Sequence, residues 1–243
     1  MKKTVFVMAA LSVLFAQTPD GSELLRKIDA NMSSRNHVLT SRMVIHGRRG
    51  SRTLEARSWT EGIEKSCTEY TAPARDKGTK MLKLEDRLWI YSPQTDRIIQ
   101  ISGHMLRQSV MGSDLSYEDM MEDPNLEQHY DAAIAGFDTV SGRNCWTLKL
   151  SARTPDLAYA SRILWVDQER FVPLREELYA KSGKLLKKLD LFDVTRIEGR
   201  WYPKRLLFKD MLKEGKGTEF FVGDISFDQE IPDYLFTKAA LRK

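Results

Sequence analysis

Residue types that perform chemistry are present in this chain, but their spacing matches no familiar catalytic pattern. The 243 residues contain no G-x-S-x-G elbow, no H-E-x-x-H pair, no C-x-x-C and no glycine loop of the phosphate-binding type. The segment GSDLS, which begins at Gly112, offers a serine and an acid without an adjacent histidine. A turn followed by a helix cap explains it better than a nucleophile does. We therefore expect a protein that is not an enzyme.

The cysteines and histidines, which bind metals or undergo redox chemistry in other proteins, are also widely spaced in the sequence. Cys67 and Cys145 lie far apart in the sequence, and they would form either one disulfide in an oxidising compartment or two separate buried thiols. The sequence leaves both alternatives open. No metal and no cofactor are expected, because the four histidines lack ligand spacing: His37, His46, His104 and His129.

Composition indicates an ordinary globular core and excludes a strongly charged surface. Hydrophobic residues make up 42% and charged residues 30%, which is sufficient for a packed interior, and the formal net charge is only +4. Basic residues alternate with acidic ones along most of the chain. The small cluster Arg48, Arg49 and Arg52 is read as a solvated turn, so no nucleic-acid partner is expected.

The first seventeen residues have the pattern of a secretory signal peptide. Lys2 and Lys3 precede an apolar run from Val5 to Ala16, which is too short to span a bilayer. We expect cleavage near Gln17 and export of residues 18–243; the alternative is an uncleaved anchor.

The hydrophobic periodicity beyond this segment predicts one helix followed mainly by strands. Leu24, Leu25, Ile28 and Met32 share one helical face within 18–32. Period-two alternation then dominates, with tight turns and no linker. About ten to twelve antiparallel strands are expected. A mainly β fold with some α follows: one strongly curved antiparallel sheet, a half-open barrel covered by short helices, forming one domain over residues 18–243.

A curved sheet of this size encloses space that side chains or a ligand must fill. Alternation does not say which face is concave, and Trp89 and Tyr91 would replace Leu88 and Ile90 if the phase were reversed. The candidates for the inner surface are Met43, Ile45, Leu82, Leu84, Leu88, Ile90, Ile99, Ile101, Trp146, Leu148, Leu150, Ile163 and Trp165.

A methionine-rich segment, residues 103–123, interrupts the strand pattern. Ser116 and Asp119 have the spacing of a capping box, which predicts a short amphipathic helix. Methionine suits surfaces that repack around varied apolar partners, although ordinary core packing explains it too. We interpret the segment as a lid over the mouth of the sheet, formed by Met105, Leu106, Val110, Met111, Leu115, Tyr117, Met120 and Met121.

Several stretches resemble the LolA/LolB-like outer-membrane lipoprotein-sorting proteins. They are LWIYSPQTDR from Leu88, MGSDLSYEDM from Met111, WVDQERFVPLREELYAKSGKLLK from Trp165 and RWYPKRLLFKD from Arg200. The likeness covers nearly all of residues 18–243, and the order of its elements is more specific than any single motif.

The resemblance implies a periplasmic carrier that sequesters acyl chains of lipoproteins, or of lipids, in a hydrophobic cavity without covalent chemistry. Its partners would be acylated lipoproteins or lipids, an inner-membrane transporter as donor and an outer-membrane acceptor, with only transient membrane contact. In the family an arginine on a strand holds the lid; no arginine of this sequence is assigned that role. The alternative is a non-carrier envelope scaffold, or an accessory subunit of an exporter, with the same fold and a filled interior.

Overall fold

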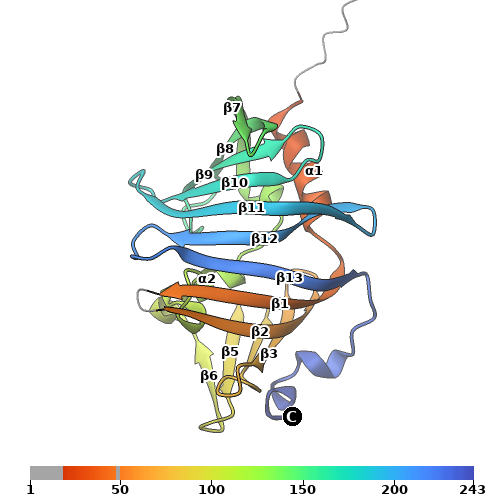
Figure 1. Ribbon diagram of the computed structural model, residues 1–243, viewed down its shortest axis with the longest axis vertical. Coiled ribbons are helices and arrows are strands. Elements are labelled where there is room, and N and C mark those ends of the chain that lie inside the picture. The colour runs from red at the N-terminus through yellow and green to blue at the C-terminus, as the bar shows by residue number, and fades with distance from the viewer. Residues whose placement is uncertain (1–18, 48–49) are drawn as a thin grey trace, which may run out of the picture.

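The computed structural model describes residues 19–47 and 50–243 of the chain. Within them the backbone forms one antiparallel sheet of thirteen strands with a few short helices (Figure 1). The strands are β1 (Asn36–Gly47), β2 (Gly50–Glu61), β3 (Lys65–Ala72), β4 (Lys80–Leu84), β5 (Arg87–Ser92), β6 (Arg97–Ile101), β7 (Tyr130–Val140), β8 (Arg143–Ala152), β9 (Ser161–Asp167), β10 (Pro173–Tyr179), β11 (Leu185–Ile197), β12 (Arg200–Asp210) and β13 (Gly217–Phe227). The expected curved antiparallel sheet is confirmed, with slightly more strands than the sequence indicated.

Two meanders make up this sheet, and the first and last strands join them. The order is β6-β5-β4-β3-β2-β1-β13-β12-β11-β10-β9-β8-β7. Consecutive strands therefore pair with each other, except that β6 does not pair with β7, and β1 pairs with β13. That pairing aligns Met43 with Phe220 and Leu39 with Ile225. The edge strands are therefore β6 and β7, which follow one another in sequence but lie at opposite ends of the sheet.

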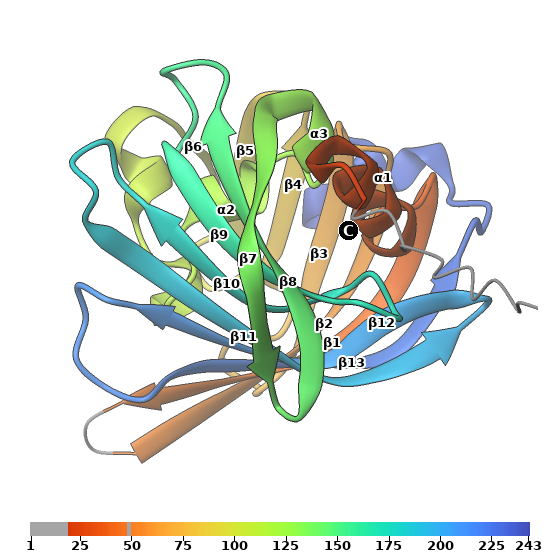
Figure 2. The same ribbon diagram turned by 90° about the horizontal axis from the view of Figure 1, so that it is seen from above.

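This topology places the segment between β6 and β7 across the open side of the sheet. Residues 103–129, called the cover below, contain η1 (Gly103–Arg107), η2 (Val110–Gly112), α2 (Tyr117–Met121) and α3 (Leu126–His129). In the view from above, α2 and α3 lie on the side toward which the sheet curves (Figure 2). Joining the two edges by so short a connection obliges the chain to pass over the inner face.

The N-terminal helix covers the rest of that face. Helix α1 (Gly21–Met32) buries Leu24, Leu25 and Ile28 against β7, β8 and β9. A Cβ at Gly21 would lie 2.4 Å from the carbonyl oxygen of Ala132 on β7, so glycine permits this close approach.

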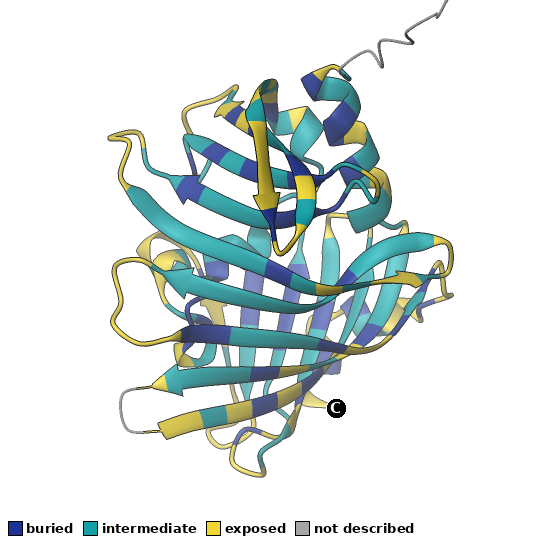
Figure 3. Cartoon of the chain, turned by 45° about the horizontal axis from the view of Figure 1, so that its top comes forward, coloured by how far each residue is buried: buried dark blue, intermediate teal, exposed yellow. Residues whose placement is uncertain are grey.

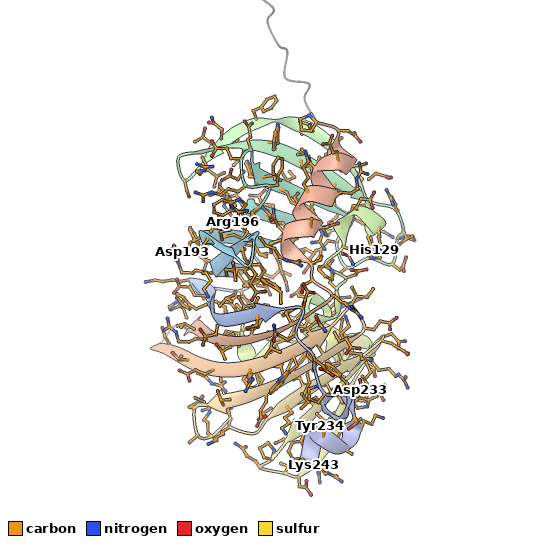
Figure 4. The ribbon with its side chains drawn as sticks, turned by 90° about the vertical axis from the view of Figure 1, so that its right-hand side faces the viewer. His129, Asp193, Arg196, Asp233, Tyr234 and Lys243 are labelled. Atoms are coloured by element: carbon orange, nitrogen blue, oxygen red, sulfur yellow. The ribbon has the colours of Figure 1, made fainter. Side chains whose placement is uncertain are left out.

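The C-terminal segment packs on the outer face of the other half. Ile231, Phe236 and Leu241, on η3 (Asp233–Phe236), η4 (Lys238–Arg242) and the chain before them, cluster with Trp89 and Leu82. Figure 4 labels Asp233, Tyr234 and Lys243 on this segment, at the lower end of the molecule. Exposed residues concentrate at the hairpin ends, whereas buried ones lie along the strands and on α1 (Figure 3).

Two of the sequence-based expectations concern residues that the structure describes only in part or not at all. The signal peptide at residues 1–17, and Arg48 and Arg49 of the basic cluster, lie outside the described residues. Arg52 forms a 2.7 Å ion pair with Asp76. None of the helices in residues 19–47 and 50–243 has the length and apolar character that crossing a bilayer requires.

Candidate functional site

The apolar side of the cover packs onto the inner face of β1–β6. All eight residues expected to form the lid belong to one hydrophobic cluster. Val110 and Tyr117 are buried, and the other six are partly buried against them. The cluster also holds Met43 and Leu54 from the sheet. The cover and this half of the sheet therefore share one apolar layer.

A capping box fixes the start of α2. The Ser116 hydroxyl accepts a bond from the Asp119 amide, and Asp119 accepts from the Ser116 amide at 2.6 Å. This confirms the sequence-based expectation. Because α2 begins at Tyr117, its next turn directs Met120 and Met121 toward the sheet.

Ion pairs attach the cover to the second half of the sheet. Lys187 on β11 pairs with Asp119, which also accepts a hydrogen bond from the Tyr159 hydroxyl. Arg162 on β9 pairs with Glu122 and, at 2.9 Å, with Glu176 on β10. The Arg162 side chain is only 5% exposed, so this ion pair is largely shielded from solvent.

Polar contacts also hold the beginning of the cover. The Thr218 hydroxyl on β13 donates a 2.8 Å bond to the Asp114 carboxylate, and the Asp210 amide donates a 3.0 Å bond to the same group. Arg52 on β2 donates to the carbonyl oxygen of Met111 at 3.3 Å. The cover is thus apolar toward the sheet and held at its rim by charged and hydroxyl groups.

The contacts of the cover with β11 and Tyr159 lower the pKa of the Asp119 carboxyl. Burial alone would raise its pKa, but the Lys187 ammonium, by charge and hydrogen bonding, and the Tyr159 hydroxyl together hold the pKa below the ordinary 3.8. Asp119 is therefore ionised at neutral pH and maintains the ion pair.

Two adjoining spaces lie beneath and beside the cover. An apolar cavity of about 90 Å³ is lined by Met43, Leu54, Ala56, Tyr70, Val110, Leu115, Met120 and Phe220, with the hydroxyls of Ser41, Ser58 and Thr68. A cleft of about 390 Å³ opens between the end of α1, the inner face of β1–β4 and the far end of the cover. Ser58, Thr68, Met120 and Phe220 line both spaces, so Met120 stands where the cleft meets the cavity.

Most of the predicted inner-face residues lie on the inner face, in two groups. Beneath the cover are Met43, Ile45, Leu88, Ile90 and Ile101. Trp146, Leu148 and Leu150 pack instead against α1. The choice between the two phases of β5 is resolved, because Trp89 and Tyr91 pack under the C-terminal segment.

Four predicted positions lie on the other face and require correction. Leu82 and Leu84 point to the outer face, where they pack with Trp89. Trp165 also faces outward, beside Val140 and Cys145, and Ile163 shares its side because it alternates with the inner Leu164. Ile99 is on the inner face, opposite Ile90, but at edge strand β6 it is 49% exposed.

Beneath the cover, the inner residues missed by sequence reasoning are Leu54, Ala56, Tyr70, Met81 and Phe220. Leu54 and Ala56 alternate with charged residues in RTLEARS, and this signal was sufficient to find them. Phe220 and Phe221 form an apolar pair, so the sequence alone does not say which of the two faces inward.

The two cysteines are free thiols in separate clusters, so the disulfide alternative is wrong for this structure. Cys67 lies on β3 and Cys145 on β8, near opposite ends of the sheet order. Burial raises the pKa of each thiol to about 11.

Acidic and imidazole side chains do not gather into a metal site. No group of three or more His, Cys, Asp or Glu in the described part of the chain could hold a metal ion. His129 instead pairs with Asp123 at 2.8 Å (Figure 4 labels His129).

A sequence-family model matches well over half of the chain. Its description is "Uncharacterized protein", and it covers residues 62–243. No curated protein sequence matches the chain.

Three solved structures share the whole fold. A DUF1329 family protein from Desulfovibrio piger is 25% identical with a TM-score of 0.83, over 91% of this chain and 97% of that one. An outer membrane lipoprotein-sorting protein domain from Vibrio parahaemolyticus is 22% identical with a TM-score of 0.79, over 92% and 98%. A LolA superfamily protein from Nitrosomonas europaea is 23% identical with a TM-score of 0.76, over 92% and 100%.

Proposed function

This chain belongs to the family whose model matches it, a family with the LolA-like fold, and from that premise we propose that it is a carrier of acyl chains. The guest is the acylated end of a lipoprotein, or a lipid, held between the sheet and the cover. The carrier works in the periplasm, taking its cargo from an inner-membrane transporter and passing it to an outer-membrane acceptor. Only transient membrane contact and no covalent chemistry are involved.

One observation carries the proposal: the cover's apolar side faces an apolar inner sheet surface, while its rim is held by reversible polar contacts. Transfer of an acyl chain from water is favourable by about 0.8 kcal/mol per methylene. Sequestering even part of such a chain therefore compensates for breaking a few rim contacts.

The closed cavity is too small for this role unless the cover moves. Its volume of about 90 Å³ equals roughly three water molecules. The acyl chain must therefore displace Met120, Leu115 and their neighbours, which then become the wall of a larger cavity. Arg162 and Arg52, the strand arginines that contact the cover, are the groups we expect to hold it closed.

The same small volume favours the second candidate, a non-carrier scaffold or exporter subunit whose interior stays filled. Uptake distinguishes the two. The purified protein is titrated with a peptide bearing one N-terminal acyl chain and, in parallel, with the same peptide unacylated. A carrier binds only the acylated peptide, in a one-to-one ratio. Failure to bind either peptide would leave the scaffold as the better account.

A further inference from the structure

A buried lysine faces the cleft without a carboxylate of its own. Lys83 on β4 is 9% exposed and lines the cleft. Its ammonium donates a 3.1 Å hydrogen bond to the carbonyl oxygen of Met121. In residues 19–47 and 50–243, no carboxylate lies within ion-pair distance of it. An ammonium has three hydrogen-bond donors, so a backbone carbonyl leaves much of its capacity for another acceptor.

The cations on the other side of the cover differ in this respect. Arg162 has Glu122 and Glu176 as partners, and Lys187 has Asp119.

The carboxylates near Lys83 are engaged elsewhere. Asp123, whose charge acts on Lys83, pairs with His129 at 2.8 Å. Glu122 pairs with Arg162. Burial lowers the pKa of the Lys83 ammonium, and Asp123 only partly opposes this. An incoming anion would relieve that unfavourable burial.

Strand register extends the polar surface from Lys83 toward the inner cavity. Lys83 lies opposite Ser66, Ser66 opposite Thr60, and Ser58 opposite Thr68. Directly opposed residues share a face of the sheet, and all of these residues line the cleft. Ser58 and Thr68 also line the apolar cavity. The inner face of the sheet therefore leads from the Lys83 ammonium, along a row of hydroxyl side chains, to the apolar cavity.

We propose that Lys83 and this row of hydroxyls bind the anionic head group, a carboxylate or a phosphate, of an amphiphile whose acyl chain enters the cavity past Met120. The inference rests on the proposed function and narrows it to a class of cargo. The anion competes with the Met121 carbonyl for the ammonium, so head-group binding also removes one contact that holds the cover closed.

The head-group site is tested by the binding of amphiphiles that have the same C16 chain and different head groups. Palmitate, 1-palmitoyl lysophosphatidic acid and hexadecanol are each used to displace an uncharged fluorescent acyl probe from the purified protein. The wild type should bind at least one anionic ligand roughly tenfold to a hundredfold more tightly than hexadecanol, because a hydrogen-bonded charge contributes about that factor. A preference for palmitate indicates a carboxylate cargo, and one for the lysophosphatidic acid a phospholipid.

Variants at two lysines of the same strand assign the preference to its source. Lys83→Gln should abolish the preference and leave hexadecanol binding unchanged, and Lys83→Arg should retain it. Lys80→Gln is the matched control, because Lys80 lies on the outer face and contacts the Ala240 carbonyl. Equal binding of all three ligands by the wild type, or a preference that survives in Lys83→Gln, would overturn the inference while the carrier stands. If the probe and the ligands do not bind at all, the carrier proposal itself fails.

Discussion

Lys187, on β11, forms an ion pair with Asp119 of the cover, a residue that precedes it by 68 positions. The two side chains are 12% and 15% exposed. This contact joins the cover, which packs on β1–β6, to the other meander of the sheet. It is therefore a latch across the open side of the molecule.

Removing the lysine should loosen the cover. Lys187→Met leaves Asp119 buried without its counter-charge, and we expect a loss of about 1–3 kcal/mol in the free energy of unfolding. Uptake of an acyl probe should become faster, which stopped-flow fluorescence measures. Lys188→Met is the control, since the next residue on the strand points to the other face. Equal effects from both variants would argue against a latch.

The same ion pair predicts a pH dependence. The pKa of Asp119 is lowered in the folded protein relative to the ordinary 3.8. The contribution to stability is therefore complete above about pH 4 to 5 and is lost as the pH falls below 3.8 toward the folded-state pKa. Thermal unfolding of the wild type should lose stability on acidification in this range more steeply than that of Asp119→Asn. Parallel curves for the two proteins would refute the assignment.

Charges on the apolar side of the cover should abolish guest binding. The double variant Met120→Asp, Met121→Asp places two carboxylates where the acyl chain would lie, and affinity for an acyl probe should fall by roughly tenfold or more. Met211→Asp is a matched control because Met211 is 45% exposed and lies outside the cover. Unchanged binding by the double variant would eliminate the cover as the wall of the site.

Filling the closed cavity separates a carrier from a scaffold. Ala56 is 8% exposed and lines the cavity of about 90 Å³. Ala56→Leu adds apolar volume there, so we expect near-neutral or slightly increased stability and weaker acyl-probe binding. Denaturant unfolding measures the stability of the variant, and fluorescence titration measures its affinity for the acyl probe. A variant that binds the probe as well as the wild type would show that guests do not use this space.

The two cysteines should behave as inert core groups. Both are buried, and burial raises the pKa of each thiol to about 11. We expect neither thiol to react with a disulfide reagent in the native protein near neutral pH, and both to react after denaturation. Prompt reaction of the native protein would show that one of them is exposed.

The sequence predicted the sheet and the cover well because their signals are local. Alternation and turn residues define the strands, and the spacing of Ser116 and Asp119 predicts the capping box that the structure contains. The apolar residues of 103–123, among them Tyr117, Met120 and Met121 at helical spacing, likewise predicted the eight lid residues that the structure brings into one cluster.

The errors of phase on β4 and β9 share a physical cause. Each strand carries a cation on its inner face, Lys83 and Arg162 respectively, and a charged residue was read as facing solvent. On β4 the outer residue Leu82 is buried by the C-terminal segment, whose sequence carries little periodic signal. Only the three-dimensional contacts, with Met121 for Lys83 and with Glu122 for Arg162, explain why these charges point inward.

Native mass spectrometry of the protein purified from cell envelopes, followed by organic extraction of bound material, tests the carrier most directly. We expect a stoichiometric acylated peptide or lipid in the complex, released by extraction. A clean apo mass, combined with no uptake when acylated peptide or lipid is added, would contradict it.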